Sequence, residues 1–291
     1  MTLDQRHQLA IIGDPVEHSL SPVMHQAAFR KCGLPYTYSK IHLRPNEVKD
    51  FFRAIKSSNF LGLNVTIPNK EAVLPFVEEL SKEAKMIGAV NTIKICEGRI
   101  LGFNTDGQGY IEALKREKHF EVKGKKILLF GAGGAARALI AALAFNGVKD
   151  IFICNRSKDR AEKLSREFSK KFIKTKILAV EWEEKALAKI SPKIDLVIQS
   201  TSLGLKGEEL PYFPWDKLPS HCLVTDIIYL PTPFLKEAQK RKFKTQNGLG
   251  MLLYQGVLAF EIWTGKKAPV LVMKRALKEA LRGKNEIADY H

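Results

Sequence analysis

The sequence predicts an α/β protein. Two short apolar runs, Ile127–Phe130 and Ile151–Cys154, lie on either side of the Ala- and Leu-rich segment Ala135–Phe145. A run of four apolar residues is typical of a strand buried on both faces, and an uninterrupted Ala- and Leu-rich segment is typical of a helix. The alternation of strands and helices continues to about Gln246, which predicts a parallel sheet covered on both faces.

A glycine-rich turn connects the first of these strands to the helix. It consists of Gly131, Ala132, Gly133, Gly134 and Ala135, followed by Ala136. Gly131 permits a tight turn, Gly133 lets the backbone approach a pyrophosphate, and Ala136 is the small residue where the helix packs on the strand. The unpaired N–H groups at the helix start would face the phosphates. With a strand on each side, the pattern favours dinucleotide binding over a merely tight turn.

The residues after the second strand indicate which dinucleotide is bound. A site for NAD would place Asp or Glu about 20 residues after the glycines, on the ribose 2′-hydroxyl. The sequence instead has Asn155, Arg156 and Ser157, with Arg160 further on. A guanidinium can bind a 2′-phosphate that a carboxylate would repel, so these residues predict a site for NADP. Alternatively, Arg156 and Arg160 are solvated residues at the start of a helix that Ser157 caps.

Length and composition are those of an ordinary globular protein. The 291 residues are 45% hydrophobic and 27% charged, which suits one large or two modest domains. No charge-free apolar stretch reaches the roughly 18 residues of a membrane span, and the N-terminus lacks the form of a signal peptide. The four scattered cysteines predict reduced, buried thiols and a cytoplasmic protein. No Cys or His spacing indicates a metal site.

The formal net charge of +16 raises the alternative of nucleic-acid binding. The basic residues are spread over the segments 115–126, 158–176, 236–244 and 266–284, where Glu and Asp are mixed with them. This distribution is typical of solvated helix faces. A positive field also suits an anionic substrate and a cofactor with an extra phosphate. We therefore expect a small-molecule substrate, with no nucleic acid and no membrane as partner.

Two serines mark the first candidate site. Leu9–Gly13 is a predicted strand, and the next helix is expected to have Ser21 as its cap, Pro22 as its first residue and Gly33 at its end. Ser19 and Ser21 would then lie in a loop and at a helix start, where hydroxyl and N–H groups could hold a carboxylate. Capping alone would explain Ser21 but not Ser19.

Further polar residues follow the next predicted strand, Leu61–Ile67. This strand brings Asn64 and Thr66 to its carboxyl end, with Lys70 just beyond Pro68. Pro68 halts strand pairing, and sites in α/β proteins form at the carboxyl ends of strands.

A predicted pair of strands comes next. Gly88–Thr92 opens the pair, Glu97-Gly98 makes its turn, and the second strand runs into Asp106. Asp106 is either part of a site or only the cap of a helix over Gln108–Lys118.

The remaining elements complete the α/β pattern. The other predicted strands are Tyr36–Leu43, Lys176–Val180, Leu196–Gln199 and Leu223–Ile228, and further helices are predicted from Pro45, from Met251 and over Val270–Leu281.

Taken together, these stretches resemble the shikimate dehydrogenase family over nearly the whole chain. The segments that carry the resemblance are Ser19-Leu20-Ser21, Asn64–Lys70, Gly88–Thr92, Asn104–Gly107, Gly131–Ala135, Asn155-Arg156-Ser157, Tyr229, Asn247–Leu252 and Gln255-Gly256. Each segment is a modest signal, but their number and order make the resemblance specific.

The resemblance implies reversible NADPH-dependent reduction of 3-dehydroshikimate to shikimate in aromatic amino-acid biosynthesis. It implies two α/β domains. Residues 1–106 and 252–291 would form the substrate-binding domain, to which the C-terminal helices return, and residues 107–251 the Rossmann-like NADP-binding domain. The expected assembly is a monomer or a homodimer.

The resemblance also implies roles for individual residues. The substrate carboxylate would contact Ser19 and Ser21, with Tyr229 nearby. The ring hydroxyls would be held by Asn64, Thr66, Asn91, Asp106 and Gln255. Lys70 and Asp106 would form the catalytic pair in contact with the substrate. The cofactor would contact Gly131, Ala132, Gly133, Gly134, Ala135, Asn155, Arg156, Ser157 and Arg160, with Ile227, Gly248 and Met251 near its nicotinamide.

The chemistry of these residue types agrees with such a reaction. Reduction of a ketone needs a hydride, which NADPH supplies, and a proton. A lysine ammonium can polarise the carbonyl and donate that proton, and a neighbouring aspartate orients the lysine while favouring its charged form. No step requires a metal.

Two departures from the family pattern stand out. Gln199 occupies a position where the family usually has Asn, and Asn69 precedes the lysine where an aromatic residue is common. Both leave the catalytic groups in place and bear on cofactor and substrate affinity.

Three alternatives compete with this interpretation. A quinate/shikimate dehydrogenase that accepts NAD is disfavoured by Arg156, and by Ser21 in place of a bulkier Thr. A methylenetetrahydrofolate dehydrogenase is disfavoured by the Lys70 and Asp106 motifs. A non-enzymatic, NADP-sensing nucleic-acid binder is disfavoured because the sequence lacks a nucleic-acid-binding motif.

Overall fold

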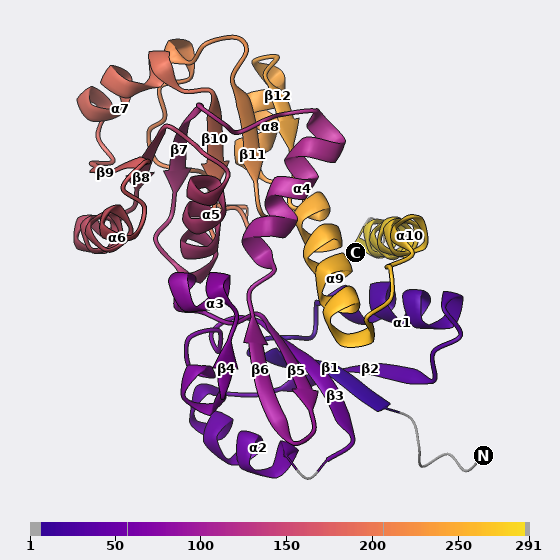
Figure 1. Ribbon diagram of the computed structural model, residues 1–291. Coiled ribbons are helices and arrows are strands. Elements are labelled where there is room, and N and C mark those ends of the chain that lie inside the picture. Colours follow the sequence, from indigo (N-terminus) through magenta and orange to yellow (C-terminus); the bar gives the residue numbers. More distant parts are fainter. Residues whose placement is uncertain (1–6, 57, 206, 289–291) are drawn as a thin grey trace. The chain divides into compact units, whose positions relative to one another are not determined.

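The computed structural model describes residues 7–56, 58–205 and 207–288, with side chains up to Arg282. The chain forms two compact units (Figure 1). The first unit contains the described residues up to Thr105 and those from Leu253 onward, and the second contains Asp106–Leu252.

The first unit contains a mixed six-stranded sheet with the strand order β2-β1-β3-β5-β6-β4. Its strands are β1 (His7–Gly13), β2 (Tyr36–His42), β3 (Phe60–Val65), β4 (Glu79–Leu80), β5 (Thr92–Cys96) and β6 (Arg99–Phe103). β1 is parallel to β2 and β3, whereas β5 is antiparallel to β3 and β6. The predicted turn at Glu97-Gly98 is confirmed: both residues have positive φ, 52° and 74°, as a tight hairpin requires.

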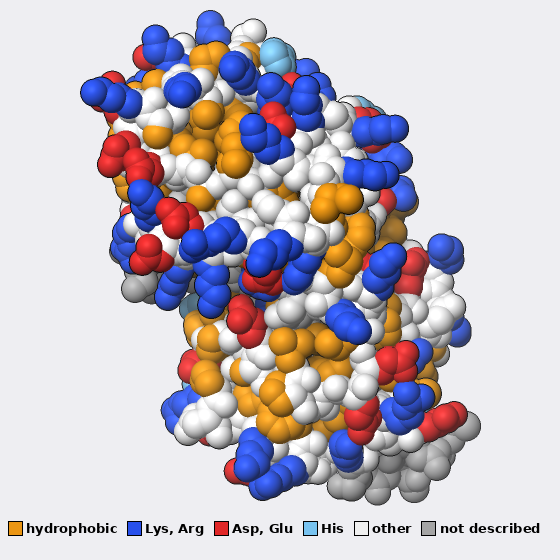
Figure 2. Space-filling view, turned by 60° about the vertical axis from the view of Figure 1, so that its left-hand side comes forward, with side chains coloured by type: hydrophobic (Ala, Val, Ile, Leu, Met, Phe, Trp, Pro, Cys, Tyr) orange, Lys and Arg blue, Asp and Glu red, His pale blue; other side chains and the backbone are white. Residues whose placement is uncertain are grey.

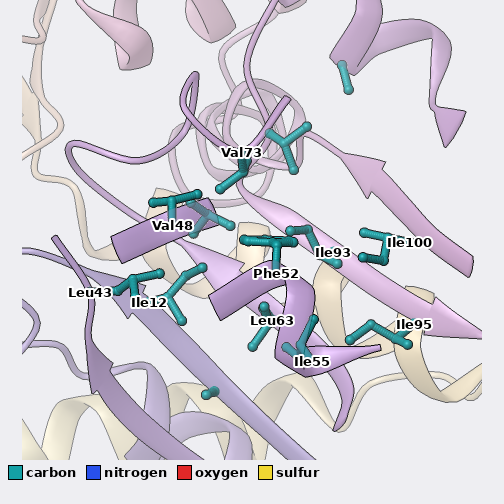
Figure 3. Close-up of a cluster of buried hydrophobic side chains, with 14 residues drawn as sticks. Ile12, Leu43, Val48, Phe52, Ile55, Leu63, Val73, Ile93, Ile95 and Ile100 are labelled. Atoms are coloured by element: carbon teal, nitrogen blue, oxygen red, sulfur yellow. The ribbon is translucent and has the colours of Figure 1, made fainter. Parts of the chain in front are cut away.

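One face of this sheet packs on α2 (Val48–Ile55), which follows a 3₁₀ turn at Pro45–Glu47. Val48, Phe52 and Ile55 are buried at the spacing of one helix face. Figure 3 shows them pointing into a cluster of side chains from the strands and loops. The other members of this cluster are Ala10, Ile12, Leu43, Leu63, Val65, Val73, Ala84, Val90, Ile93, Ile95 and Ile100.

The opposite face of the sheet receives helices from both ends of the chain. These are α1 (Ser21–Lys31), the part of α9 (Leu249–Thr264) that begins at Leu253, and α10 (Val270–Ala288), which packs on α1. Trp263 of α9 donates a hydrogen bond to the Ile93 carbonyl at 2.8 Å. A Cβ at Gly62 of β3 would lie 2.3 Å from the Trp263 indole nitrogen, so only glycine admits this ring. The return of the C-terminal helices to the first unit is therefore confirmed.

The second unit contains a fully parallel six-stranded sheet in the order β12-β11-β10-β7-β8-β9. Its strands are β7 (Lys126–Phe130), β8 (Asp150–Cys154), β9 (Lys176–Val180), β10 (Leu196–Gln199), β11 (Leu223–Asp226) and β12 (Lys244–Gln246). The strand order reverses between β7 and β10, as in a Rossmann fold, where ligands bind outside the carboxyl ends of the strands at the switch point. The predicted parallel sheet is confirmed.

Helices connect these strands. They are α4 (Asp106–Lys118), α5 (Gly134–Phe145), α6 (Lys158–Lys171), α7 (Glu184–Ile190) and α8 (Pro233–Lys240). Residues Ile127–Phe130 of β7 are fully buried, as the apolar run predicts. α4 crosses α5 closely, because a Cβ at Gly107 would lie 2.3 Å from the Ala138 carbonyl oxygen.

Several predicted boundaries were wrong by one or more residues. β3 ends at Val65 and β11 at Asp226, each two residues before the predicted end, and α10 continues past Leu281. Several short elements were not predicted from the sequence, among them β4, α3 (Lys82–Ile87) and 3₁₀ turns at Leu74–Phe76, Ser191–Lys193 and Trp215–Lys217. Their few residues do not complete a hydrophobic period.

The surface mixes charges of both signs. On the face in Figure 2, Lys and Arg side chains are spread widely, with Asp and Glu between them. Across the described part of the chain, no helix combines the length and the apolar character that crossing a membrane demands. All four cysteines are free, and Cys154 and Cys222 are buried, but the prediction of a buried thiol was wrong for the exposed Cys96, which ends β5 at the hairpin turn.

Candidate active site

The two candidate serines lie at the start of α1. The expectation that Ser21 caps this helix was wrong: Leu20 is the N-cap, and Ser21 is the first helical residue, without a side-chain capping bond. Instead, the Ser21 N–H donates to the Ser19 hydroxyl at 3.2 Å. Ser19 thus partners a helix-start N–H, which leaves the hydroxyl proton of Ser19 available to another acceptor.

Asn64 is buried on β3, on the sheet face opposite the α2 cluster. Its side-chain oxygen accepts a hydrogen bond from the Tyr38 hydroxyl at 2.6 Å. Its side-chain nitrogen donates to the Asn91 carbonyl and to the Thr92 hydroxyl, both at 3.2 Å. The amide oxygen of Asn64 faces a hydroxyl that donates, and its amide nitrogen faces a carbonyl that can only accept. These contacts hold the Asn64 side chain in one orientation.

Lys70 follows a loop that is attached to the sheet. Thr66 lies just past the end of β3, and its N–H donates to the Ile12 carbonyl at 2.9 Å. Asn69 is fully buried and donates from its side chain to the Leu43 carbonyl at 2.7 Å. The Lys70 carbonyl accepts from the Val90 N–H at 2.8 Å. Asn69, the departure from the family pattern, therefore anchors the loop in front of a half-buried lysine.

Asn91 forms the centre of a second set of contacts. Its side-chain oxygen accepts from the Thr105 N–H at 2.8 Å and from the Thr92 hydroxyl at 2.9 Å, and its nitrogen donates to the Thr105 hydroxyl at 3.0 Å. Asp106 is the next residue in the chain and begins α4. The alternative in which Asp106 is only the cap of a helix over Gln108–Lys118 does not match the structure, because α4 starts two residues earlier and includes Asp106.

The glycine turn of the second unit has the geometry that a phosphate site requires. Gly131 has φ +117°, a conformation that L side chains rarely adopt, and a Cβ there would lie 2.6 Å from the Ser200 hydroxyl. Gly133 is the N-cap of α5 and gives it no side-chain cap. A Cβ at Gly133 or Gly134 would meet nothing within 4 Å. Open space thus lies over the helix start, and these residues fit the pyrophosphate of a dinucleotide.

The segment after β8 presents basic side chains. Arg156 and Arg160 are exposed, and neither forms an ion pair with another described residue. Asn155 donates from its side chain to the Ser157 carbonyl at 3.0 Å. Ser157 occupies the N-cap position of α6 as expected, but the predicted capping hydrogen bond is absent from this N-cap.

Gln199, the other departure from the family pattern, is fully buried at the end of β10. Its side chain donates to the Leu203 carbonyl at 2.7 Å and accepts from the Thr201 N–H at 2.5 Å. The Ser200 hydroxyl donates to the Phe130 carbonyl at 2.6 Å, directly before Gly131. The Gln199 side chain therefore fixes the turn that follows β10, and Ser200 of this turn bonds to the residue before Gly131.

The segment after β11 forms a compact arrangement with the residues before α9. The Gly248 N–H donates to the Ile228 carbonyl and the Asn247 side chain donates to the Tyr229 carbonyl, both at 3.0 Å. A Cβ at Gly248 would lie only 1.8 Å from the Ile227 carbonyl oxygen, so this approach requires glycine. Met251 and Gln255 follow on α9, and both are largely buried.

Each unit also contains buried polar residues that were not predicted from the sequence. Tyr38, Thr92 and Thr105 make hydrogen bonds to the predicted residues Asn64 and Asn91. Asp226 ends β11, accepting from the Ile228 N–H and the Thr232 hydroxyl at 2.9 Å each. Its burial raises its pKa to about 6, against the lowering effect of these two bonds. The sequence showed which polar residues lie at strand ends, but not which side chains they bond to.

Metal ligands do not gather in the described residues. Within residues 7–56, 58–205 and 207–282, no three His, Cys, Asp or Glu side chains form a group that could hold a metal ion.

Three family models match the chain. The shikimate dehydrogenase substrate-binding domain matches residues 11–93, the shikimate/quinate 5-dehydrogenase model matches residues 113–205, and the shikimate 5′-dehydrogenase C-terminal domain matches residues 248–278. These three stretches include parts of both units.

Individual relatives match over nearly the full length. The NADP⁺-dependent shikimate dehydrogenase of Desulforamulus reducens is 46% identical over 278 residues, which are 94% of this chain and 95% of the relative. The crystal structure of shikimate 5-dehydrogenase from Thermus thermophilus with NADP(H) and shikimate is 37% identical, with a TM-score of 0.80 over 94% of this chain and 99% of that one. The Listeria monocytogenes enzyme, with shikimate and NAD, is 38% identical, with a TM-score of 0.86 over 94% and 96%. The chain therefore belongs to the shikimate dehydrogenase family.

Proposed function

We propose that this chain catalyses the reversible NADPH-dependent reduction of 3-dehydroshikimate to shikimate. The observation that carries the proposal is the buried network of Asn64, Asn91 and Thr105, which the Lys70–Val90 hydrogen bond joins to the segment carrying Lys70. Fixed amide and hydroxyl groups suit a ring that carries several hydroxyls, and a lysine on the adjoining segment suits proton transfer to a ring carbonyl. The ligands of the Thermus relative agree with this choice.

Each group of substrate atoms has its own residues in this proposal. The carboxylate is held by Ser19 and Ser21, with Tyr229 nearby. The ring hydroxyls are held by Asn64, Thr66, Asn91, Asp106 and Gln255. Support for the serines comes from the hydrogen bond between the Ser21 N–H and the Ser19 hydroxyl, because an oxygen that accepts a backbone N–H can still donate its own proton to an anion.

Lys70 and Asp106 form the proposed catalytic pair. The Lys70 ammonium donates a proton to the carbonyl oxygen in the direction of reduction, and the neutral amine accepts it in reverse. The Asp106 carboxylate orients the ammonium and accepts from a ring hydroxyl. The attachment of Asn69 to Leu43 limits the movement of the lysine backbone, which favours a fixed donor position.

The proposed cofactor contacts lie in the second unit. Bound NADPH supplies the hydride. Gly131–Ala135 would hold the pyrophosphate. Arg156 and Arg160, with Asn155 and Ser157, would hold the 2′-phosphate, and Ile227, Gly248 and Met251 would line the nicotinamide end. Support comes from the open space at Gly133 and Gly134 and from the exposed guanidinium groups.

The proposal assigns one role to each unit. The first unit is the substrate-binding domain and the second the NADP-binding domain, with boundaries near residues 106 and 252. A cytoplasmic location and a monomeric or homodimeric assembly complete the proposal, and both depend on the sequence alone.

Absorbance at 340 nm tests the function directly. Shikimate and quinate would each be offered NADP⁺ and NAD⁺, which separates the proposed activity from a quinate/shikimate dehydrogenase that uses NAD. We expect shikimate with NADP⁺ to give the highest kcat/KM. Faster oxidation of quinate, or equal rates with both cofactors, would replace the proposal with the alternative.

A further inference from the structure

Tyr38 contacts a residue that the proposed function assigns to the ring hydroxyls of the substrate. It is buried on β2, and its hydroxyl donates to the Asn64 side-chain oxygen at 2.6 Å. One phenolic oxygen thus holds the amide of the proposed ring-hydroxyl site at Asn64.

The direction of this hydrogen bond is determined by the groups involved. The amide oxygen of Asn64 can only accept, so the phenolic proton points to Asn64. Burial raises the pKa of Tyr38 well above its usual value, and the hydroxyl stays protonated. Asn64 is thereby oriented so that its nitrogen donates to the Asn91 carbonyl and the Thr92 hydroxyl.

The network continues from Asn64 toward the segment that carries Asp106. Thr92 donates to the Asn91 side chain at 2.9 Å, and Asn91 in turn holds Thr105, the residue before Asp106. A shift of the Tyr38 hydroxyl would therefore move the Asn64 and Asn91 side chains together.

The ring of Tyr38 is held independently of its hydroxyl. It stacks on His25 with 4.7 Å between the ring centroids and 13° between the planes, and Trp263 lies 6.1 Å away. Because these contacts involve the ring and not its hydroxyl, a phenylalanine at position 38 would keep them and lose only the oxygen atom.

We infer that Tyr38 is a positioning residue for substrate binding, whose hydroxyl orients the Asn64 amide toward the ring-hydroxyl site. The inference rests on the proposed function for the identity of the substrate. That Tyr38 orients Asn64 does not depend on it.

Tyr38→Phe tests the inference, and Tyr36→Phe is the matched control. Tyr36 is on the same strand, and its hydroxyl forms no hydrogen bond with a described residue. The centroid of its ring lies 5.5 Å from that of the Phe29 ring. We expect Tyr38→Phe to raise the KM for shikimate by about tenfold, with a smaller change in kcat and an unchanged KM for NADP⁺. Tyr36→Phe should leave all three near their original values, and both variants should have similar Tm.

A second measurement separates this inference from the proposed function. The side-chain amide of Asn64 gives NMR signals that can be assigned by their loss in Asn64→Asp. Tyr38→Phe should shift these signals and speed their hydrogen exchange, whereas Tyr36→Phe should not. If the chain turned over no shikimate, the proposed function would fail, while unchanged Asn64 signals in Tyr38→Phe would show that Tyr38 does not position Asn64.

The combination of results decides the substrate part of the inference. A shifted Asn64 signal with an unchanged KM for shikimate would overturn it, because the residue would then be positioned without effect on binding. Equal losses in Tyr38→Phe and Tyr36→Phe would also overturn it, because they would indicate a general loosening of β2.

Discussion

At the scale of single residues, His25 shows how burial controls protonation. It lies fully buried on α1 among the rings of Phe29, Tyr38 and Trp263, and neither ring nitrogen has a hydrogen-bond partner among the described residues. Burial lowers the pKa of His25 to about 3. An unfolded histidine has a pKa of about 6.5, so below that pH the unfolded chain binds a proton that the folded chain does not. Stability from this group is therefore lost as the pH falls from about 6.5 toward 3.

We expect His25→Phe to reduce the acid sensitivity of folding. Relative to the unchanged protein, the variant should gain about 2 kcal/mol of unfolding free energy when the pH is lowered from 7 to 5. Urea unfolding at both pH values measures this difference. His221→Phe is the control, because His221 is exposed beside Asp195 and should show no such gain. Equal pH dependence in His25→Phe and the unchanged protein would mean that folded His25 accepts a proton.

Lys70 and Asp106 carry the prediction about catalysis. If the lysine is the proton donor, Lys70→Ala and Asp106→Ala should each lower kcat by at least about a hundredfold, with the fold and NADP binding retained. The double variant should be little worse than the worse single variant, because groups that act as a unit are non-additive. Steady-state kinetics and circular dichroism measure these outcomes.

The control for this prediction is Lys85→Ala, which removes an exposed lysine from α3 in the same unit and should leave kcat unchanged. A near-normal kcat in Lys70→Ala would rule out the catalytic role. A rise in KM alone would make Lys70 a binding residue and assign proton transfer to a water molecule.

Residue types at strand ends were predictable from the sequence, but their hydrogen-bond partners were not. Asn64 and Asn91 stood out as polar residues next to apolar runs, whereas Tyr38 had the alternating pattern of an ordinary strand. Its role depends on β2, β1 and β3 being neighbours in the sheet, which spacing along the chain does not specify. The wrong prediction that Ser21 caps α1 has a similar cause. The helix begins one residue earlier than predicted, so Ser21 is its first residue and its N–H donates to the Ser19 hydroxyl.

At the scale of elements, the connection from β11 to α8 contains a buried carboxyl group. Asp226 is the last residue of β11 and accepts from the Ile228 N–H and the Thr232 hydroxyl, the N-cap of α8. Its burial raises its pKa from 3.8 to about 6. Between these values the folded chain binds a proton that the unfolded chain does not, so stability from this group is present at low pH and is lost as the pH rises through about 6.

Asp226→Asn should remove this pH dependence. The amide oxygen can still accept from Ile228, and the amide nitrogen can donate to the Thr232 hydroxyl oxygen. The unfolding free energy of the variant relative to the unchanged protein should rise by about 2 kcal/mol between pH 4 and pH 8. Denaturant unfolding across this range measures the trend. Asp216→Asn, a change at an exposed aspartate of the same unit, is the control and should show no comparable rise.

The type of each long element followed from its apolar pattern, whereas its ends depended on tertiary contacts. α2 was predictable because Val48, Phe52 and Ile55 share one helix face. β4 was not predictable, because it has two residues and exists through its pairing with β6. The end of β11 at Asp226 is set by the side-chain bond to Ile228, which turns the backbone away from the sheet.

At the scale of the whole molecule, the first unit is assembled from chain segments far apart in the sequence. Trp263 bonds to Ile93, and the Lys94 ammonium donates to the Ile262 carbonyl at 2.9 Å. Periodicity predicts that the segment around Trp263 is helical, but it does not specify which sheet the helix covers. That part of the fold came from the family resemblance, which uses the order of motifs over the whole chain.

The choice of cofactor is also a property of the whole molecule, because a ligand that binds only the folded chain stabilises it. At a concentration 100 times its Kd, NADP⁺ should raise the unfolding free energy by about 2.7 kcal/mol. Arg156 is exposed and lies two residues after the end of β8. We assign its guanidinium to the 2′-phosphate. A lost charged hydrogen bond weakens binding by about 1.5–3 kcal/mol, which is about tenfold or more.

Arg156→Ala should therefore lower the stabilisation by the same concentration of NADP⁺ to about 1.4 kcal/mol or less. The stabilisation by NAD⁺ should hardly change, because NAD⁺ has no 2′-phosphate for the guanidinium to contact. Thermal and urea unfolding with each cofactor measure the effect. Arg166→Ala is the control, because Arg166 lies on α6 as an exposed partner of Glu162 and has no assigned contact with the cofactor. Equal losses for NADP⁺ and NAD⁺ in Arg156→Ala would show that the residue supports the shape of the site and does not select the phosphate. In that case Arg160, in the first turn of α6, would be the next residue to change.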